Sequence, residues 1–132
     1  MIALDTNLLV RLLIQDDASQ ARAVERLFIR ARRDRTQLFV ADVVLCELVW
    51  VLSRRAKVSR AGIADALEQL LNAETILVSD SGVARGALAA YRTGSGDFAD
   101  YLIRDQALAA GASEVVTFDR AVRGETGFKV LR

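Results

Sequence analysis

The chain has 132 residues, 52% of them hydrophobic, and a formal net charge of +1 at pH 7. This length suits one domain with a substantial core, and the near-neutral charge argues against a surface that coats polyanions broadly. Histidine is absent, which excludes Ser-His-Asp and Cys-His catalysis and histidine-bound zinc. Chemistry must therefore come from carboxylates, hydroxyls, Lys or Arg, or a bound metal.

We expect a cytoplasmic protein without a membrane span. The N-terminal residues reach Asp5 and Arg11 without the basic region and long apolar region of a signal peptide, and no apolar run is long enough to cross a bilayer. The single cysteine, Cys46, cannot form an internal disulfide. Its apolar neighbours predict a place in the core, which suits a reducing compartment.

The first seven residues predict a short buried strand that ends at Asp5. An apolar run without alternation is typical of a central strand in a parallel sheet, whose ligands bind beyond the carboxyl ends of the strands. Asp5 could instead only cap the helix expected at Leu8–Leu13, because Asp is a common N-cap residue. The choice between these roles depends on whether other acids gather near Asp5.

Helices and strands alternate along the rest of the chain. Apolar residues at helical spacing predict helices that begin near Asp16 or Asp17, at Asp42 as a candidate N-cap, and near Ser59, Ser79 and Asp97, the last one ending at Gly111. Short apolar runs predict strands at Leu38–Ala41, Glu74–Val78, Glu114–Phe118 and Phe128–Leu131. This alternation indicates a doubly wound α/β domain. The arginines of residues 30–35 could grip phosphate, but stabilisation of a helix end through its dipole is the favoured interpretation.

Glu47 lies within the apolar run Val43–Leu52. A carboxylate in that setting is costly to bury unless it is paired or bound to a cation. Glu47 is therefore the second acid, after Asp5, that suggests a functional site.

Two acids directly follow predicted strands, Asp5 after the first and Asp119 after the fourth. If those strands are neighbours, both carboxylates meet at one crevice, and Glu47 and Asp100 could reach it from nearby helices. Several carboxylates in one pocket repel each other and are tolerable mainly when a cation holds them. Oxygen ligands without His or Cys suit Mg²⁺ or Mn²⁺.

Asp97 and Asp100 both stand at the start of a predicted helix. Asp97 at the N-cap is expected to use its oxygens on the backbone amides of Ala99 or Asp100, whereas Asp100 is freer to face the cleft. We therefore rank Asp100 above Asp97 as a metal ligand.

The sequence resembles the PIN-domain ribonucleases, and more closely the VapC toxins of type II toxin–antitoxin modules. The resemblance rests on four segments and covers nearly the whole chain: LDTN at 4–7, VVLCELVWVL at 43–52, DFADYLI at 97–103 and TFDR at 117–120. Tyr101 and the pair Arg104-Asp105 depart from it, because small residues are common after the helix-start Asp. These departures concern the packing of that helix rather than the acids.

The resemblance implies a single PIN domain over residues 1–132, with a mainly parallel sheet of about five strands in the order 3-2-1-4-5, flanked by helices. It implies a Mg²⁺- or Mn²⁺-dependent endoribonuclease that hydrolyses RNA such as tRNA or rRNA. Its partners would be a VapB-like antitoxin and a second copy in a homodimer. It assigns the metal site and catalysis to Asp5, Glu47, Asp100 and Asp119, with Asp97 as an extra acid and Thr6, Asn7 and Thr117 as supporting residues.

Two other functions are also considered. A phosphatase or phosphotransferase of another α/β fold also places an Asp after its first strand, but it typically has a second acid two positions later, where this chain has Asn7. A non-catalytic PIN-like module that binds RNA or protein would be expected to have an incomplete set of acids. Apolar residues on the early helices could form partner surfaces, although core packing explains most of them equally well: Leu9, Leu12, Leu13, Val49 and Trp50.

Overall fold

The computed structural model describes residues 1–132 and divides into two units, Met1–Ser81 and Gly82–Arg132. In the first unit, the strands β1 (Ile2–Ala3), β2 (Leu38–Val40) and β3 (Ile76–Val78) form a parallel sheet in the order β1-β2-β3. Leu38 pairs with Ile2 on one side and with Ile76 on the other. Since the strands are parallel, the segments that follow all three leave the same edge of the sheet.

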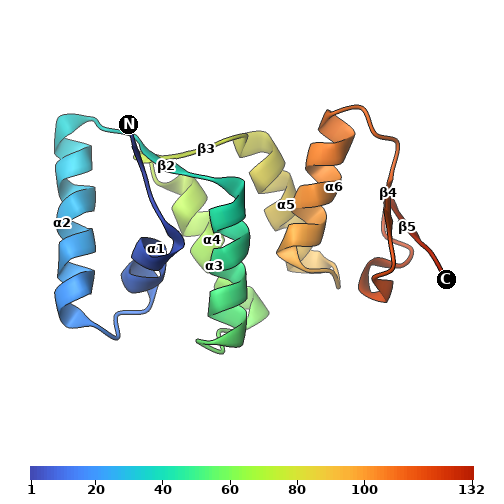
Figure 1. Ribbon diagram of the computed structural model, residues 1–132, viewed down its shortest axis with the longest axis horizontal. Coiled ribbons are helices and arrows are strands. Elements are labelled where there is room, and N and C mark those ends of the chain that lie inside the picture. The colour runs from blue at the N-terminus through green and yellow to red at the C-terminus, as the bar shows by residue number, and fades with distance from the viewer. The chain divides into compact units, whose positions relative to one another are not determined.

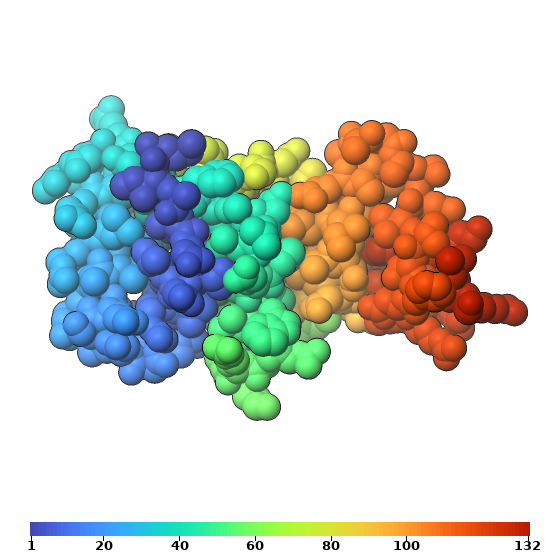
Figure 2. All heavy atoms as spheres, viewed as in Figure 1, coloured from blue at the N-terminus to red at the C-terminus, as the bar shows by residue number.

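Four helices pack around this sheet: α1 (Thr6–Leu13), α2 (Ala18–Asp34), α3 (Asp42–Arg54) and α4 (Arg60–Asn72). Helix α1 contacts both α2 and α3 and lies between them, and α4 contacts α3 and β3 (Figure 1). In the space-filling view, the blue atoms of α1 are in contact with α2 on one side and with α3 on the other (Figure 2). The core of this unit includes Leu9, Leu38, Leu45, Leu48, Leu52 and Leu67.

The second unit contains α5 (Ser81–Thr93), α6 (Phe98–Ala109), β4 (Val115–Thr117), a 3-10 turn η1 (Arg120–Val122) and β5 (Phe128–Val130). Strands β4 and β5 form a parallel pair, and α6 packs against β4. Phe98 and Tyr101 are fully buried, and the rings of Tyr91 and Phe98 meet edge to face at 6.2 Å. The first turn of α6 is thereby tied to α5.

The α/β class and the parallel strand pairing are confirmed, and each predicted helix and strand is present within a few residues of its expected bounds. A single sheet of about five strands in the order 3-2-1-4-5 is not confirmed, because the strands form one three-stranded and one two-stranded sheet. The turn η1 was not predicted, since three residues are too few to give a periodic pattern. None of the helices combines the length and apolar character that a bilayer span requires.

Two expectations about α3 need correction. Ala41, not Asp42, is the N-cap residue, so Asp42 is the first residue inside the helix. Cys46 is half-buried rather than part of the core. Asp42 and Cys46 are both half-buried, at the edge of the buried face of α3, and a very apolar sequence gives little indication of which face turns inward.

Candidate active site

Thr6 connects two of the predicted metal ligands in the first unit. Its backbone N–H donates to Asp5 Oδ1 at 2.7 Å, and its hydroxyl donates to Glu47 Oε2 at 3.1 Å. Thr6 is also the one buried polar residue of the chain, with 4% of its surface exposed. Asp5, at the end of β1, and Glu47, in the second turn of α3, are therefore held near each other by one intervening residue.

The structure corrects the expected setting of Glu47. Its side chain is exposed, although its neighbours Leu45 and Leu48 are fully buried. The helix turns Glu47 outward, on the same face as Val43 and Trp50, which are 62% and 53% exposed. The cost of burying a charge therefore does not apply to Glu47, and its oxygens are open to a ligand.

Asp5 caps helix α1, which is one of the two roles considered for it. It has an extended backbone at the N-cap position, and its side chain accepts the Thr6 N–H. Thr6 and Asn7, which follow it, lie inside the helix. Capping uses one carboxylate oxygen, so Asp5 can cap the helix and still offer its other oxygen to a cation.

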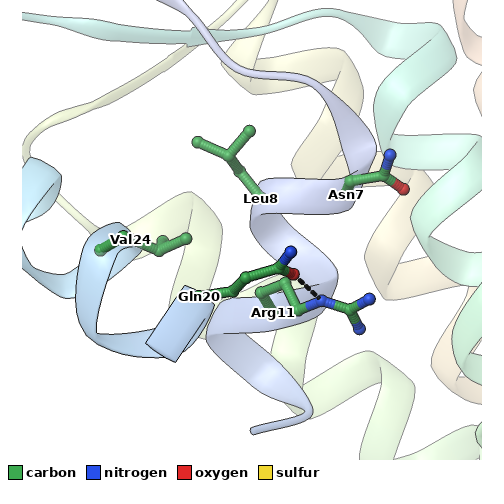
Figure 3. A pocket seen from close by; sticks show the side chains of 6 residues that line it. Asn7, Leu8, Arg11, Gln20 and Val24 are labelled. Atoms are coloured by element: carbon green, nitrogen blue, oxygen red, sulfur yellow. Dashed lines mark hydrogen bonds between the residues drawn. The ribbon is translucent and has the colours of Figure 1, made fainter. Parts of the chain in front are cut away.

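Asn7 lies beside a pocket of about 300 Å³ between α1 and α2. Figure 3 shows Asn7, Leu8 and Arg11 on α1, with Gln20 and Val24 opposite them on α2. The Arg11 Nε donates to Gln20 Oε1, and its terminal nitrogen forms an ion pair with Asp16 at 3.0 Å. Arg11 therefore links α1 to α2 and to the segment before α2, while its side chain remains partly exposed.

Asp97 and Asp100 begin helix α6 in the second unit. Asp97 is the N-cap residue, and its backbone N–H donates to Asp100 Oδ2 at 2.9 Å. One oxygen of Asp100 is thus used within the helix terminus, so Asp100 is less free than the sequence suggested. Its remaining oxygen is available to a ligand.

Burial raises the pKa of the Asp100 carboxyl above its ordinary value, and the Asp97 N–H bond opposes this effect. The negative charges of Asp119, Asp97 and Glu125 raise the same pKa further. Asp100 therefore lies in a region of negative charge formed by three other carboxylates. Such a region favours either a proton on Asp100 or a nearby cation.

Asp119 stands where β4 passes into η1. Its backbone N–H donates to Thr117 Oγ1 at 3.1 Å, and its Oδ1 accepts the Ala121 N–H at 2.9 Å. Thr117 and Asp119 thus fix this turn from both sides. The Asp119 side chain is exposed and keeps one oxygen outside these bonds.

The surroundings of Tyr101 were not predicted from the sequence. Its hydroxyl lies 2.8 and 3.0 Å from the two Glu125 oxygens, which share its single proton, and it accepts the Gly96 N–H at 2.8 Å. Arg104 lies over the rings of Tyr101 and Phe128, at 5.2 and 5.5 Å from their centroids. The only sign in the sequence was a tyrosine where small residues are usual after the helix-start Asp. That sign did not identify the residues that Tyr101 contacts.

The donor atoms of the predicted site fit a hard divalent cation, because every one of them is a carboxylate or hydroxyl oxygen. The raised pKa of Asp100, caused by burial and by neighbouring carboxylates, fits the same interpretation. Neither unit by itself gathers three ligand side chains in an arrangement that could hold a metal ion. Within the units, the structure links Asp5 with Glu47, Asp97 with Asp100, and Thr117 with Asp119.

Comparison with known proteins identifies the family. The sequence model of the PIN domain matches residues 2–124. The chain belongs to the PIN-domain family. It is also 31% identical to a VapC ribonuclease of Aquifex aeolicus (strain VF5) over 131 residues, which is 99% of this chain and 96% of that protein. The resemblance seen in four short segments therefore extends along the whole PIN domain.

Proposed function

We propose that this PIN domain is an endoribonuclease toxin of the VapC type, which hydrolyses phosphodiester bonds in RNA such as tRNA or rRNA. The observation that supports this most strongly is the similarity to a VapC ribonuclease along 99% of the chain. The acids that follow β1 and β4, together with those in the second turn of α3 and the first turn of α6, supply the chemistry. The single-domain arrangement over residues 1–132 is part of the same proposal.

The metal site in this proposal consists of Asp5, Glu47, Asp100 and Asp119, with Asp97 as an additional acid. A bound Mg²⁺ or Mn²⁺ would lower the pKa of the attacking water and neutralise charge on the phosphate. Thr6 orients Asp5 and Glu47 through its N–H and its hydroxyl, and Thr117 supports the turn at Asp119. Asn7, next to Asp5, is a further supporting residue.

Asp100 is the best candidate for the proton acceptor. Burial and neighbouring charges raise the pKa of its carboxyl, and a raised pKa makes a carboxylate a stronger base at neutral pH. The oxygen that is not bonded to the Asp97 N–H would orient the attacking water and take its proton.

RNA would be held by cations near these acids. Arg104 is occupied by its two aromatic rings, by Asp105 at 2.9 Å and by the Thr126 carbonyl at 3.2 Å. Arg120, the first residue of η1 and the neighbour of Asp119, and Arg123, which follows η1, are both exposed. They are better placed than Arg104 to contact the phosphates of a substrate.

A VapB-like antitoxin and a second copy of the chain are the proposed protein partners, and the cytoplasm is the proposed location. Leu9 and Val49 belong to the core and cannot form such surfaces, and Leu12 and Leu13 are half-buried. Trp50 is 53% exposed and remains the best apolar candidate for a partner contact.

The test is an RNA cleavage assay with purified protein and Mg²⁺ or Mn²⁺. Asp5→Asn removes charge but little volume, and its amide oxygen can still cap α1, so the fold should persist while cleavage falls at least a hundredfold. Asp34→Asn is the matched control, because Asp34 is exposed and pairs with its neighbour Arg33 at the end of α2. Cleavage at the wild-type rate by folded Asp5→Asn would refute the assignment.

A further inference from the structure

The hydroxyl of Tyr101 lies between two segments that flank helix α6. The backbone N–H of Gly96 donates to it at 2.8 Å, and it donates to Glu125 at 2.8 Å. Tyr101 has no exposed surface, and Glu125 is half-buried. The loop before α6 and the segment after η1 are thus joined through a single buried oxygen atom.

The loop before α6 fits closely against this tyrosine. A Cβ built on Gly96 would lie 2.5 Å from Val122 Cγ1 and 3.1 Å from the Tyr101 ring, and one built on Gly94 would overlap both the Tyr101 hydroxyl and Glu125. Side chains at these two positions would push the loop away from Tyr101. Their absence lets the loop backbone approach the hydroxyl closely enough to form the bond.

The next residues along the chain are the acids of the proposed site. Gly96 immediately precedes Asp97, and the Asp97 N–H donates to Asp100 Oδ2 at 2.9 Å. A continuous chain of hydrogen bonds and one peptide unit therefore runs from Glu125 through Tyr101 and Gly96 to Asp97 and Asp100. A shift of the Gly96 backbone would move both carboxylates.

We propose that Tyr101 and Glu125 are positioning residues, which hold Asp97 and Asp100 in the geometry that binds the divalent cation. This inference rests on the proposed function. Neither residue belongs to the predicted set of ligands, and Glu125 lies just beyond residues 2–124, which match the PIN domain. Both Glu125 oxygens lie within hydrogen-bond distance of the Tyr101 hydroxyl, which fits an orienting role better than a ligand role.

The first experiment measures Mn²⁺ binding by calorimetry, and RNA cleavage in parallel, for Tyr101→Phe. This change removes the hydroxyl and keeps the ring between Arg104 and the core. Loss of a group that orients metal ligands typically costs 10- to 100-fold in affinity or activity, so we expect the Mn²⁺ dissociation constant to rise at least about tenfold. An unchanged dissociation constant in the folded variant would overturn the proposal.

Tyr91→Phe is the matched control. Tyr91 is also buried in the second unit, 3% exposed, and packs against Phe98 at the start of α6. Tyr91 belongs to α5 and is not one of the residues that position Asp100 in this proposal, so Mn²⁺ affinity should remain within about twofold of wild type. An equal loss of affinity in both variants would show a general effect of destabilising this unit and would contradict the specific role of Tyr101.

Two substitutions of Glu125 distinguish a role in orienting Tyr101 from an effect of its negative charge. Glu125→Gln keeps an oxygen that accepts from Tyr101 but removes the negative charge, whereas Glu125→Ala removes both. A positioning role predicts near wild-type Mn²⁺ affinity for Glu125→Gln and at least a tenfold loss for Glu125→Ala. Equal losses in the two variants would mean that Glu125 acts through its charge, and no loss in Glu125→Ala would also overturn the proposal.

The same measurements separate this inference from the proposed function. If the wild-type protein neither binds Mn²⁺ nor cleaves RNA, the proposed function fails. If it does both and the Tyr101 and Glu125 variants match it, the positioning role alone fails. Substitutions within one series of hydrogen bonds should have non-additive effects on Mn²⁺ affinity. The double variant Tyr101→Phe, Glu125→Ala should therefore bind Mn²⁺ no more weakly than the worse single variant.

Discussion

Thr6 is the residue that most directly ties local structure to the proposed chemistry. A threonine in the first turn of a helix commonly bonds to nearby backbone, but its hydroxyl here donates to Glu47, a residue 41 positions away. Its backbone N–H donates a hydrogen bond to the Asp5 carboxylate. The relative placement of the two carboxylates therefore depends on one small buried side chain.

Thr6→Val removes this hydroxyl and nearly preserves the shape of the side chain. We expect the free energy of unfolding to fall by about 1 kcal/mol, because a typical protein hydrogen bond contributes that much. RNA cleavage should fall as well, since Glu47 loses its orientation. Urea denaturation and a cleavage assay would measure both effects. Thr6→Ser keeps the hydroxyl and should restore cleavage; equal activity of the Val and Ser variants would argue against an orienting role.

The raised pKa of Asp100 predicts how the stability of the metal-free protein depends on pH. Burial raises the pKa of its carboxyl above the ordinary value of 3.8, so the folded state holds the proton more tightly than the unfolded state does. Stability therefore falls as pH rises from about that ordinary value through the raised pKa. Asp100→Asn should then stabilise the metal-free protein at pH 7, and the gain should vanish below the ordinary pKa.

Thermal unfolding in EDTA at several pH values would measure this gain. Asp34→Asn is the contrasting control, because a hydrogen bond from Arg33 lowers the pKa of the Asp34 carboxyl. Removing that carboxylate should give no stabilisation at pH 7. A metal-free Asp100→Asn protein that is no more stable than wild type at neutral pH would contradict the inferred burial of charge.

At the scale of elements, helix α6 is tied to strand β5 by Arg104. Its guanidinium lies over the rings of Tyr101 and Phe128 and bonds to the Thr126 carbonyl. Gly127 has a positive φ of 85°, and a Cβ there would lie 2.7 Å from Arg104 Cδ. Tyr101 and Arg104, which replace the small residues usual after the helix-start Asp, therefore pack together against the C-terminal strand.

Arg104→Lys should destabilise the protein although it keeps the charge. A lysine cannot reproduce the planar stacking or the fixed set of donors, so we expect a loss of about 1–2 kcal/mol in the free energy of unfolding. Arg33→Lys is the control, because the side chain of Arg33 is 70% exposed and that of Arg104 only 15%. Exposed pairs contribute little. Equal stability of the two variants in urea would show that the stacking contributes nothing.

The sequence predicted those elements whose signals are local. Asp17 and Ser59 cap α2 and α4 as expected, because a cap requires only the residue and the amides that follow it. The bond from Thr6 to Glu47 and the bond from Tyr101 to Glu125 span 41 and 24 residues. No local pattern specifies such contacts. The exposure of Glu47 was missed for a related reason, since the rotation of a very apolar helix depends on its packing partners.

At the scale of the whole molecule, the predicted acids are divided between the two units. Asp5 and Glu47 belong to Met1–Ser81, and Asp100 and Asp119 belong to Gly82–Arg132. The PIN-domain match covers residues 2–124 and so includes all of them. The proposed cation binding therefore requires carboxylates of each unit to be tested separately.

Mn²⁺ calorimetry on matched variants tests the proposed cation binding most directly. Asp5→Asn and Asp119→Asn each remove one charge from a different unit, and Asp34→Asn removes an exposed charge outside the proposed site. We expect wild type and Asp34→Asn to bind Mn²⁺ alike, while Asp5→Asn and Asp119→Asn each lose at least about tenfold in affinity. Wild-type Mn²⁺ affinity in either folded site variant would contradict this expectation.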